Sequence, residues 1–188
     1  YNNYGNVSGA YFNGTGGIIG GAYKFDGIND FIKLRDSALI SQYPSHTIEC
    51  WIYWNGSNGT IGLQDIYAED RSTNEVVEYL NIYWGAPQFA IVTGGARYST
   101  DSNVSLQPNR WYYLVGILDS IGGMSIYVNG NKTGTNSHTD RVSDTITSVQ
   151  IGKVTNGGGR DFFSGYIDEL ILYNLPLSSE QILEHYFK

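Results

Sequence analysis

Short runs of strand-forming residues recur along the whole chain and are separated by glycine-rich turns. In the run "MSIYVNG", Met124, Ile126 and Val128 alternate with Ser125 and Tyr127, and Asn-Gly follows. Alternating side chains point to opposite faces of a strand, so one face of this run is apolar. Asn-Gly between two such runs is a strong hairpin signal. Many short strands at this spacing predict an antiparallel all-β sandwich or barrel.

The composition agrees with this prediction. Sixteen tyrosines and four tryptophans suit half-buried pleated surfaces, and twenty-four glycines suit turns. Charged residues make up only 15% of the chain, which argues against intrinsic disorder. A length of 188 residues suits one domain with a core of its own. We therefore expect a single domain over residues 1–188.

The charge balance argues against a nucleic-acid partner. The formal net charge is −7, and the eleven basic residues are spread along the chain instead of clustered. No apolar run approaches the roughly 20 residues of a membrane span, so we expect no membrane insertion. The chain starts at Tyr1 without a methionine or a signal peptide, which indicates a mature protein or an excised module.

Six N-x-[ST] sequons indicate an extracellular or cell-surface location, because this motif marks surface loops of secreted proteins. The candidate glycosylation sites are Asn6, Asn13, Asn55, Asn58, Asn103 and Asn131. Cys50 is the single cysteine and lies in the strand-like run "TIECWIYW". It has no partner for an intrachain disulfide, and we expect it to be a small buried hydrophobe.

One helix is predicted at the C-terminal end, in "NLPLSSEQILEHYFK". Ser178 and Gln181 have the spacing of a capping box, which marks a helix start. Four apolar residues then form a stripe along one side of the helix. They are Ile182, Leu183, Tyr186 and Phe187. A helix this short is not stable alone in water, so we expect it to pack on the sandwich.

Four phrases in order give the chain a family resemblance. They are "GGAYKFDGINDFIKL", "HTIECWIYW", "NRWYYLVGILDSIGGMSIYVNG" and "FSGYIDELILYNLPLSSEQILEHY". Together they resemble the concanavalin A-like jelly roll, and in particular its laminin-G-like branch. The resemblance implies an antiparallel two-sheet jelly-roll sandwich with a short C-terminal helix. It also implies a module that binds carbohydrates or proteins, usually as part of a larger surface or secreted protein.

A calcium site is the first candidate site. The run "KFDGINDFIKL" offers Asp26, Asn29 and Asp30, and calcium prefers six to eight oxygen ligands. Some relatives hold calcium near this turn and the "IDE" strand, so the resemblance adds Asp168. We then expect Asp26 and Asp168 to lie close together. The alternative is a turn closed by Asx hydrogen bonds, with Asp168 paired to backbone amides or to an arginine.

A carbohydrate site is the second candidate, because aromatic rings in loops can stack on sugar rings beside polar groups. Trp54 and Trp84 lie next to glycine-rich turns, and four more residues lie in or beside polar segments. These four are Tyr67, Tyr98, Arg160 and Asp161. Trp51 and Trp111 occupy strand positions, and we expect them in the core.

Catalysis is not expected. Glycosidases of this fold class carry two carboxylates in an E-x-D-x-E or E-x-D-x-x-E pattern, which is missing here. The three histidines are isolated in the sequence. The leading hypothesis is a non-catalytic extracellular carbohydrate-binding or adhesion module, with calcium as its candidate cofactor and a glycan or cell-surface protein as its partner. The alternatives are a structural or protein-interaction domain of a surface assembly such as a filament or coat, and, third, a polysaccharide hydrolase or lyase domain.

Overall fold

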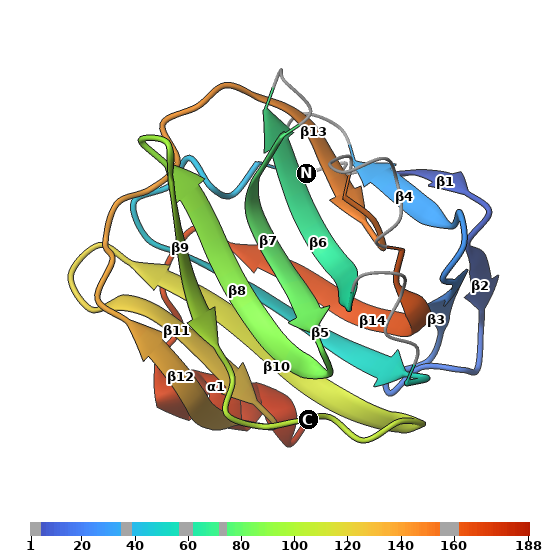
Figure 1. Cartoon of the computed structure of the whole chain (residues 1–188). Coiled ribbons are helices and arrows are strands. Elements are labelled where there is room, and N and C mark those ends of the chain that lie inside the picture. Colours follow the sequence, from blue (N-terminus) through green and yellow to red (C-terminus); the bar gives the residue numbers. More distant parts are fainter. Residues whose placement is uncertain (1–4, 35–38, 57–61, 72–74, 155–161) are drawn as a thin grey trace.

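Two antiparallel seven-stranded sheets face each other in the computed structural model, which describes residues 5–34, 39–56, 62–71, 75–154 and 162–188 (Figure 1). The front sheet in Figure 1 has the order β1 (Gly5–Ser8), β4 (Phe31–Leu34), β13 (Ile146–Ile151), β6 (Leu63–Arg71), β7 (Glu75–Tyr83), β8 (Ala86–Thr93) and β9 (Ala96–Asp101). The back sheet has the order β12 (Asn131–Asn136), β11 (Gly123–Val128), β10 (Arg110–Asp119), β5 (His46–Trp54), β14 (Ser164–Tyr173), β3 (Ala22–Asp26) and β2 (Tyr11–Asn13). The predicted jelly-roll sandwich is confirmed.

The core lies between the two sheets and follows the alternation of the central strands. On β5, Ile48, Cys50 and Ile52 point inward and are fully buried. Leu114 and Leu118 of the neighbouring β10 join the same cluster. Cys50 is the small buried hydrophobe that the sequence predicted, and burial raises the pKa of its thiol.

Among the described residues, three hairpins have two-residue turns in which both residues adopt positive φ, and in the one between β8 and β9 both residues are glycines, Gly94 and Gly95. Asn129 and Gly130, with φ of 51° and 78°, join β11 to β12. This confirms the hairpin predicted from Asn-Gly. Trp84 and Gly85, with φ of 48° and 83°, join β7 to β8 in the same way. A bulky residue such as tryptophan rarely adopts a positive φ, so the Trp84–Gly85 turn is strained.

The C-terminal helix α1 (Ser179–Tyr186) covers part of the outer face of the back sheet. Its start is the predicted capping box: the Ser178 Oγ accepts from the Gln181 N–H at 3.3 Å, and the Gln181 Oε1 accepts from the Ser178 N–H at 2.9 Å. Of the predicted stripe only Ile182 is buried and Tyr186 is half-buried, whereas Leu183 and Phe187 are 43% and 75% exposed. In the described part of the chain, no helix has the length and apolarity needed to cross a membrane.

Trp51 and Trp111, which we expected in the core, do not lie between the sheets, although Trp51 packs against the smaller apolar cluster beneath α1. Both residues alternate with the inward-pointing side chains of their strands and therefore lie on the outer face of the back sheet. Trp51 is half-buried beneath α1, where its ring stacks on Tyr186 with centroids 5.6 Å apart. Trp111 is half-buried against Tyr53, with centroids 5.8 Å apart.

A buried charged pair lies inside the sandwich. The His46 Nε2 lies 2.9 Å from the Glu78 Oε1, and both side chains are fully buried. The His46 Nδ1 lies 3.0 Å from the carbonyl oxygen of Tyr43, so Nδ1 must carry a proton. Burial lowers the pKa of His46, but the charge and hydrogen bond of Glu78 outweigh this, so the pKa is raised. Burial also raises the pKa of Glu78, and His46 offsets this only in part.

A second carboxylate faces this pair. Glu69 pairs with Glu78 in the ladder between β6 and β7 and is also fully buried. The Glu69 Oε1 accepts from the Ile40 N–H at 2.6 Å, the Ser41 N–H at 3.2 Å and the Tyr67 hydroxyl at 2.6 Å. The Ser41 hydroxyl donates to the other Glu69 oxygen at 2.5 Å. These donors satisfy both oxygens of the buried Glu69 side chain.

We expect the His46–Glu78 pair to make folding stability fall as pH rises. The folded pKa of His46 lies above its unfolded value of about 6.5, so the pair stabilises the fold fully below that pH. This stabilisation is lost as pH rises through the folded pKa of His46. Its size is about 1.4 kcal/mol for each unit by which the folded pKa exceeds the unfolded one. The measurement is the free energy of unfolding by denaturant, taken between pH 5.5 and 9 for the wild type and for Glu78→Gln. The variant should lose this downward slope, and identical slopes would contradict the assignment.

Candidate functional site

The turn between β3 and β4 is closed by its own side chains. The Asp26 Oδ1 accepts from the backbone N–H groups of Ile28 at 2.8 Å and Asn29 at 3.1 Å. The Asp30 Oδ2 accepts from the Asp26 N–H at 2.9 Å. Burial raises the pKa of the Asp26 carboxyl, but these backbone donors outweigh it and the pKa is lowered. The geometry is the Asx turn that the sequence offered as the alternative to a calcium loop.

Asp168 has a separate set of partners. It is buried on β14, and its Oδ2 accepts from the N–H groups of Ile18 at 2.7 Å and Ile19 at 3.1 Å. Its Oδ1 accepts from the Glu169 N–H at 2.9 Å. These bonds satisfy a buried carboxylate with backbone amides, which is the other alternative that the sequence left open. Asp168 therefore fixes the loop that precedes β3 against β14.

The strand register separates Asp26 from Asp168. On the ladder between β3 and β14, Asp26 pairs with Ser164, and Asp168 lies four residues further along β14. Four strand residues span about 13 Å, whereas two carboxylates that share one calcium ion lie within about 5 Å of each other. The expectation that the two aspartates lie close together is wrong. In the described residues no three His, Cys, Asp or Glu side chains gather in a way that could hold a metal.

Two of the predicted sugar-stacking rings belong to the core. Trp54 is 3% exposed, and its Nε1–H donates to the Gln64 Oε1 at 3.1 Å. Tyr67 is fully buried, and its hydroxyl donates to Glu69. Both rings point between the sheets, where no glycan can reach them. The polar neighbours that suggested a loop around Tyr67 are buried side chains of β6.

Tyr98 is also unsuited to stacking on a sugar. It is half-buried and packs against the core, and one face of its ring is covered by the imidazole of His138. The two ring centroids are 3.6 Å apart and the planes are nearly parallel. The remaining predicted contacts, Arg160 and Asp161, lie outside the described residues, as does the sequon residue Asn58.

The five sequons within the described residues lie at the surface to different degrees. Asn6, Asn55, Asn103 and Asn131 are exposed, and Asn13 is half-buried. Their glycosylation stays a prediction.

Trp84 is the one predicted aromatic contact that the structure leaves open to solvent. It is 65% exposed at the tip of the β7–β8 hairpin. Its backbone N–H donates to the carbonyl of Gly62 at 2.7 Å, and its ring lies directly against the same glycine. A Cβ at position 62 would come within 2.4 Å of the indole, so only glycine leaves room for the ring. An exposed, strained tryptophan is typical of a binding position.

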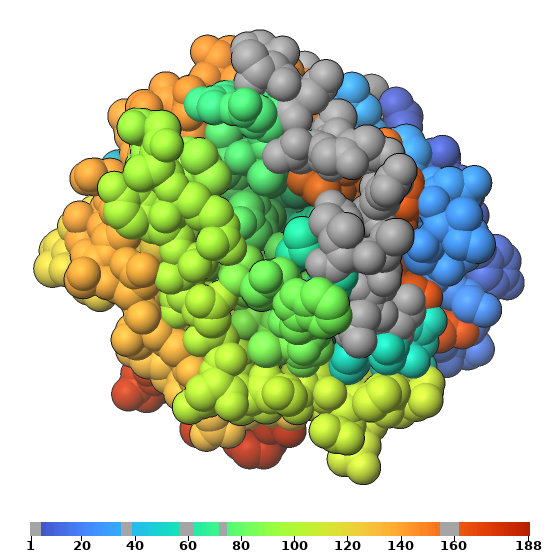
Figure 2. Space-filling view, in the orientation of Figure 1, coloured from blue at the N-terminus to red at the C-terminus, as the bar shows by residue number. Residues whose placement is uncertain are grey.

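A row of polar side chains crosses the outer face of the front sheet, the face turned toward the reader in Figure 2. The row is formed by Asp65, Asn81, Gln88 and Asp101, which are ladder partners on β6, β7, β8 and β9. The Asn81 Nδ2 donates to the Asp65 Oδ1 at 3.3 Å, and the Gln88 Nε2 donates to the Asp101 Oδ1. The first three residues are buried, whereas Asp101 is exposed. We call this set the polar row.

Arg97 connects the polar row to an aromatic ring. Its Nη2 donates to the Gln88 Oε1 at 2.5 Å, and its Nε donates to the Tyr79 hydroxyl. Asn81 is 1% exposed, and its Oδ1 has no hydrogen-bond partner in the described part of the molecule. By strand alternation Tyr83, which is 44% exposed, shares this face with Tyr79 and Asn81. This face was not predicted from the sequence, although the alternation in "YLNIY" indicates it.

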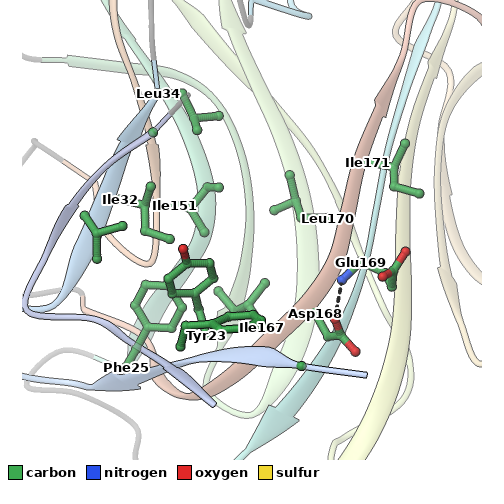
Figure 3. A pocket seen from close by; sticks show the side chains of 14 residues that line it. Tyr23, Phe25, Ile32, Leu34, Ile151, Ile167, Asp168, Glu169, Leu170 and Ile171 are labelled. Atoms are coloured by element: carbon green, nitrogen blue, oxygen red, sulfur yellow. Dashed lines mark hydrogen bonds between the residues drawn. The ribbon is translucent and has the colours of Figure 1, made fainter. Parts of the chain in front are cut away.

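A pocket of about 560 Å³ opens at the edge of the sandwich on the side of β1 and β2. Figure 3 shows aromatic and aliphatic side chains of β3, β4 and β13 on one side, with Leu170 of β14 across from them. Asp168 and Glu169 lie at the β14 side of the lining. The polar row is on the outer face of the front sheet, so the two features are separate.

Comparison with known proteins identifies the family. The model of the Laminin_G_3 family, described as the concanavalin A-like lectin/glucanases superfamily, matches residues 26–183. The chain belongs to this concanavalin A-like superfamily. No curated protein sequence matches the chain. The resemblance inferred from the four sequence phrases is confirmed.

Solved structures with this concanavalin A-like fold include the receptor binding domains of botulinum neurotoxins. Those of the C/D mosaic serotype, serotype D and type G superpose with TM-scores of 0.76, 0.74 and 0.73, each at 16% identity. Each match covers 100% of this chain but only 46%, 48% and 46% of the other chain, respectively. The chain thus spans less than half the length of these domains. At this identity the likeness shows the fold.

We expect Asp168→Ala to destabilise the fold, because it leaves three backbone N–H groups without their acceptor. The expected loss is roughly 1–3 kcal/mol in the free energy of unfolding, measured by denaturant titration. Glu169→Ala is the matched control, since Glu169 is exposed and should change stability by less than about 0.5 kcal/mol. Equal effects of the two variants would show that Asp168 does not hold the loop.

Calcium binding at Asp26, Asn29 and Asp30 stays a prediction, and Asp168 is no longer part of it. If the turn binds calcium, added calcium raises the melting temperature, EDTA lowers it, and Asp26→Asn removes both responses. Thermal unfolding with EDTA and with added calcium is the measurement. Identical curves under the two conditions would reject the site.

Proposed function

We propose that this chain is a non-catalytic carbohydrate-binding module that acts outside the cell or at its surface. The family and the receptor-binding neighbours support a binding module. The observation that carries the glycan proposal is Trp84, which is strained and exposed at the tip of the β7–β8 hairpin, the hairpin whose strands carry Asn81 and Gln88 of the polar row.

The chemistry of this face suits a sugar. The faces of Trp84 and Tyr83 offer apolar surface for the C–H side of a sugar ring. Arg97 donates and Asp101 accepts hydrogen bonds, and both are exposed at the β9 end of the polar row. A few fixed polar groups beside apolar surface are typical of small-ligand sites.

The arrangement of acidic residues supports binding without catalysis. Glycoside hydrolysis needs two carboxylates that reach the scissile bond from opposite sides. Glu69 and Glu78 are ladder partners, but both are fully buried between the sheets and are held by His46, Ser41 and Tyr67. A polysaccharide cannot reach them there.

A protein-interaction role in a surface assembly is the second candidate. Leu183 and Phe187 are exposed on the outer side of α1, and exposed apolar residues of this size are typical of contacts with another protein. Self-association that Phe187→Ser abolishes and that free sugars do not affect would favour this role over glycan binding.

We expect Trp84→Asn to abolish glycan binding without loss of stability. Asparagine suits the first position of this turn better than tryptophan, so the melting temperature should be equal or higher. Binding to glycans selected by an array of the wild type should fall at least about tenfold. Tyr11→Ala is the matched control, because Tyr11 is equally exposed, at 66%, but lies on the back sheet.

The array is run with calcium and with EDTA, which also tests calcium dependence. Binding that needs calcium but survives Asp26→Asn would place the ion elsewhere. A wild-type protein that binds none of a diverse glycan set under either condition would reject the carbohydrate proposal.

A further inference from the structure

A row of aromatic side chains crosses the outer face of the back sheet, beside the part that α1 covers. Tyr166 of β14, Tyr53 of β5 and Trp111 of β10 are ladder partners on three strands that lie side by side (Figure 1). The residues next to them in each strand, such as Ile52 and Ile167, point into the core, so the rings point outward. None of the three rings belongs to the core cluster or to the cluster beneath α1. We call them the aromatic row.

The aromatic row is held in place and is open to solvent. The Tyr53 ring centroid lies 5.8 Å from the centroid of Trp111 and 5.8 Å from that of Tyr166, and all three rings are half-buried. The two tyrosine hydroxyls and the indole N–H make no hydrogen bond within the part of the chain that the structure describes. Each ring therefore has a polar tip that is available to a ligand.

Lys24 on β3 extends the aromatic row by one strand. It is exposed, it is the ladder partner of Tyr166, and its Nζ lies 5.9 Å from the centre of that ring. From Lys24 to Trp111 the row crosses three strand spacings of about 4.8 Å each, or roughly 14 Å in all. This length is greater than that of one sugar ring, so the row suits a chain that runs across the strands.

The chemistry of the row suits a sugar chain better than the apolar patch of a partner protein. Aromatic faces offer apolar surface to the C–H side of a sugar, and the polar ring tips and Lys24 can bond to its hydroxyls. No aliphatic side chain belongs to the row. The cluster beneath α1, which does bury a protein segment, contains the aliphatic residues Val115, Ile117, Leu177 and Ile182.

The charges near the row favour an uncharged ligand. Asp26 lies two residues from Lys24 along β3, so it is on the same face, and it is exposed. Its carboxylate can accept hydrogen bonds from hydroxyls and offsets the positive charge of Lys24. Because the whole chain carries a formal net charge of −7, a polysaccharide rich in carboxylates would be repelled.

We propose that the aromatic row and Lys24 form a second carbohydrate-binding face, which takes an extended, uncharged polysaccharide with a β-1,4-linked glucan or mannan backbone. The polysaccharide lies across β3, β14, β5 and β10, with its sugar rings against the aromatic rings. Ladder partners lie opposite one another, so the row offers a contact at each successive strand. This inference goes beyond the proposed function, because the row lies on the back sheet and Trp84 lies on the front sheet.

Native gel electrophoresis with a soluble polysaccharide cast into the gel tests the proposal. We expect glucomannan and hydroxyethyl cellulose to retard the wild type, and the anionic polygalacturonate to retard it little. Cellohexaose should compete at a concentration at least about tenfold lower than cellobiose does, because only the longer chain covers the row. A wild type that neither neutral polysaccharide retards, or that polygalacturonate retards as strongly, would overturn the proposal.

Substitutions in the row locate the site. Trp111→Ala and Tyr166→Ala should each weaken polysaccharide binding at least about fivefold, whereas Trp111→Phe keeps a ring and should retain most of it. Tyr43→Ala is the matched control, because Tyr43 is 43% exposed and lies outside the row. Thermal unfolding checks that each variant folds. Equal retardation of Tyr43→Ala and of the folded row variants would place the polysaccharide elsewhere.

Two further measurements separate the row from other surfaces. Trp84→Asn should leave gel retardation unchanged, and Trp111→Ala should leave the binding of short array glycans unchanged, so the two carbohydrate proposals can fail independently. Loss of retardation in a folded Trp84→Asn variant would count against the row. Light scattering tests the protein alternative: self-association that Trp111→Ala abolishes would assign the row to a contact between copies and overturn the proposal.

Discussion

The inward alternation of β5 and β10 is the constraint on which the rest of the structure depends. These adjacent strands of nine and ten residues bury Ile48, Cys50 and Ile52 on one strand and Leu114 on the other. A strand that sends every second side chain into the core sends the others outward. The outer face of the back sheet therefore carries aromatic residues such as Trp51, and α1 is needed to cover them. The same rule applied to β7 places Asn81 on the outer face of the front sheet.

Charged residues are built into this core as a hydrogen-bonded cluster. Glu69 and Glu78 are fully buried ladder partners, and two bare carboxylates there would repel each other strongly. Two residues resolve the conflict: Ser41, in the segment before β5, donates to Glu69, and His46, the first residue of β5, pairs with Glu78. The cluster ties that segment to the front sheet. A partner lost from a buried network costs more than a surface hydrogen bond, because the remaining group stays unsatisfied.

Patterns among neighbouring residues predicted the fold well, whereas features that depend on how strands pair could not be predicted from the sequence. The capping box at Ser178 and the Asn-Gly hairpin depend on a few neighbouring residues, and both were predicted. The polar strands β9 and β12 carry no apolar alternation, and they were missed. The resemblance placed Asp26 and Asp168 on strands that are indeed neighbours, but only the ladder shows that they are four positions apart. Trp54 was predicted as a sugar contact because it lies beside a glycine-rich turn, but as the last residue of β5 it still points into the core.

Differences in strand length explain why the sandwich is closely packed on one side and hollow on the other. The strands β6 to β8 have eight or nine residues and face β5 and β10, so long apolar faces meet. The strands β1 to β4 have only three to five residues, and short faces cannot fill the space between the sheets. The polar row lies on the closely packed side, where long paired strands hold Gln88 and Arg97 against each other. The fold thus provides a well-packed outer face on which polar side chains keep fixed positions.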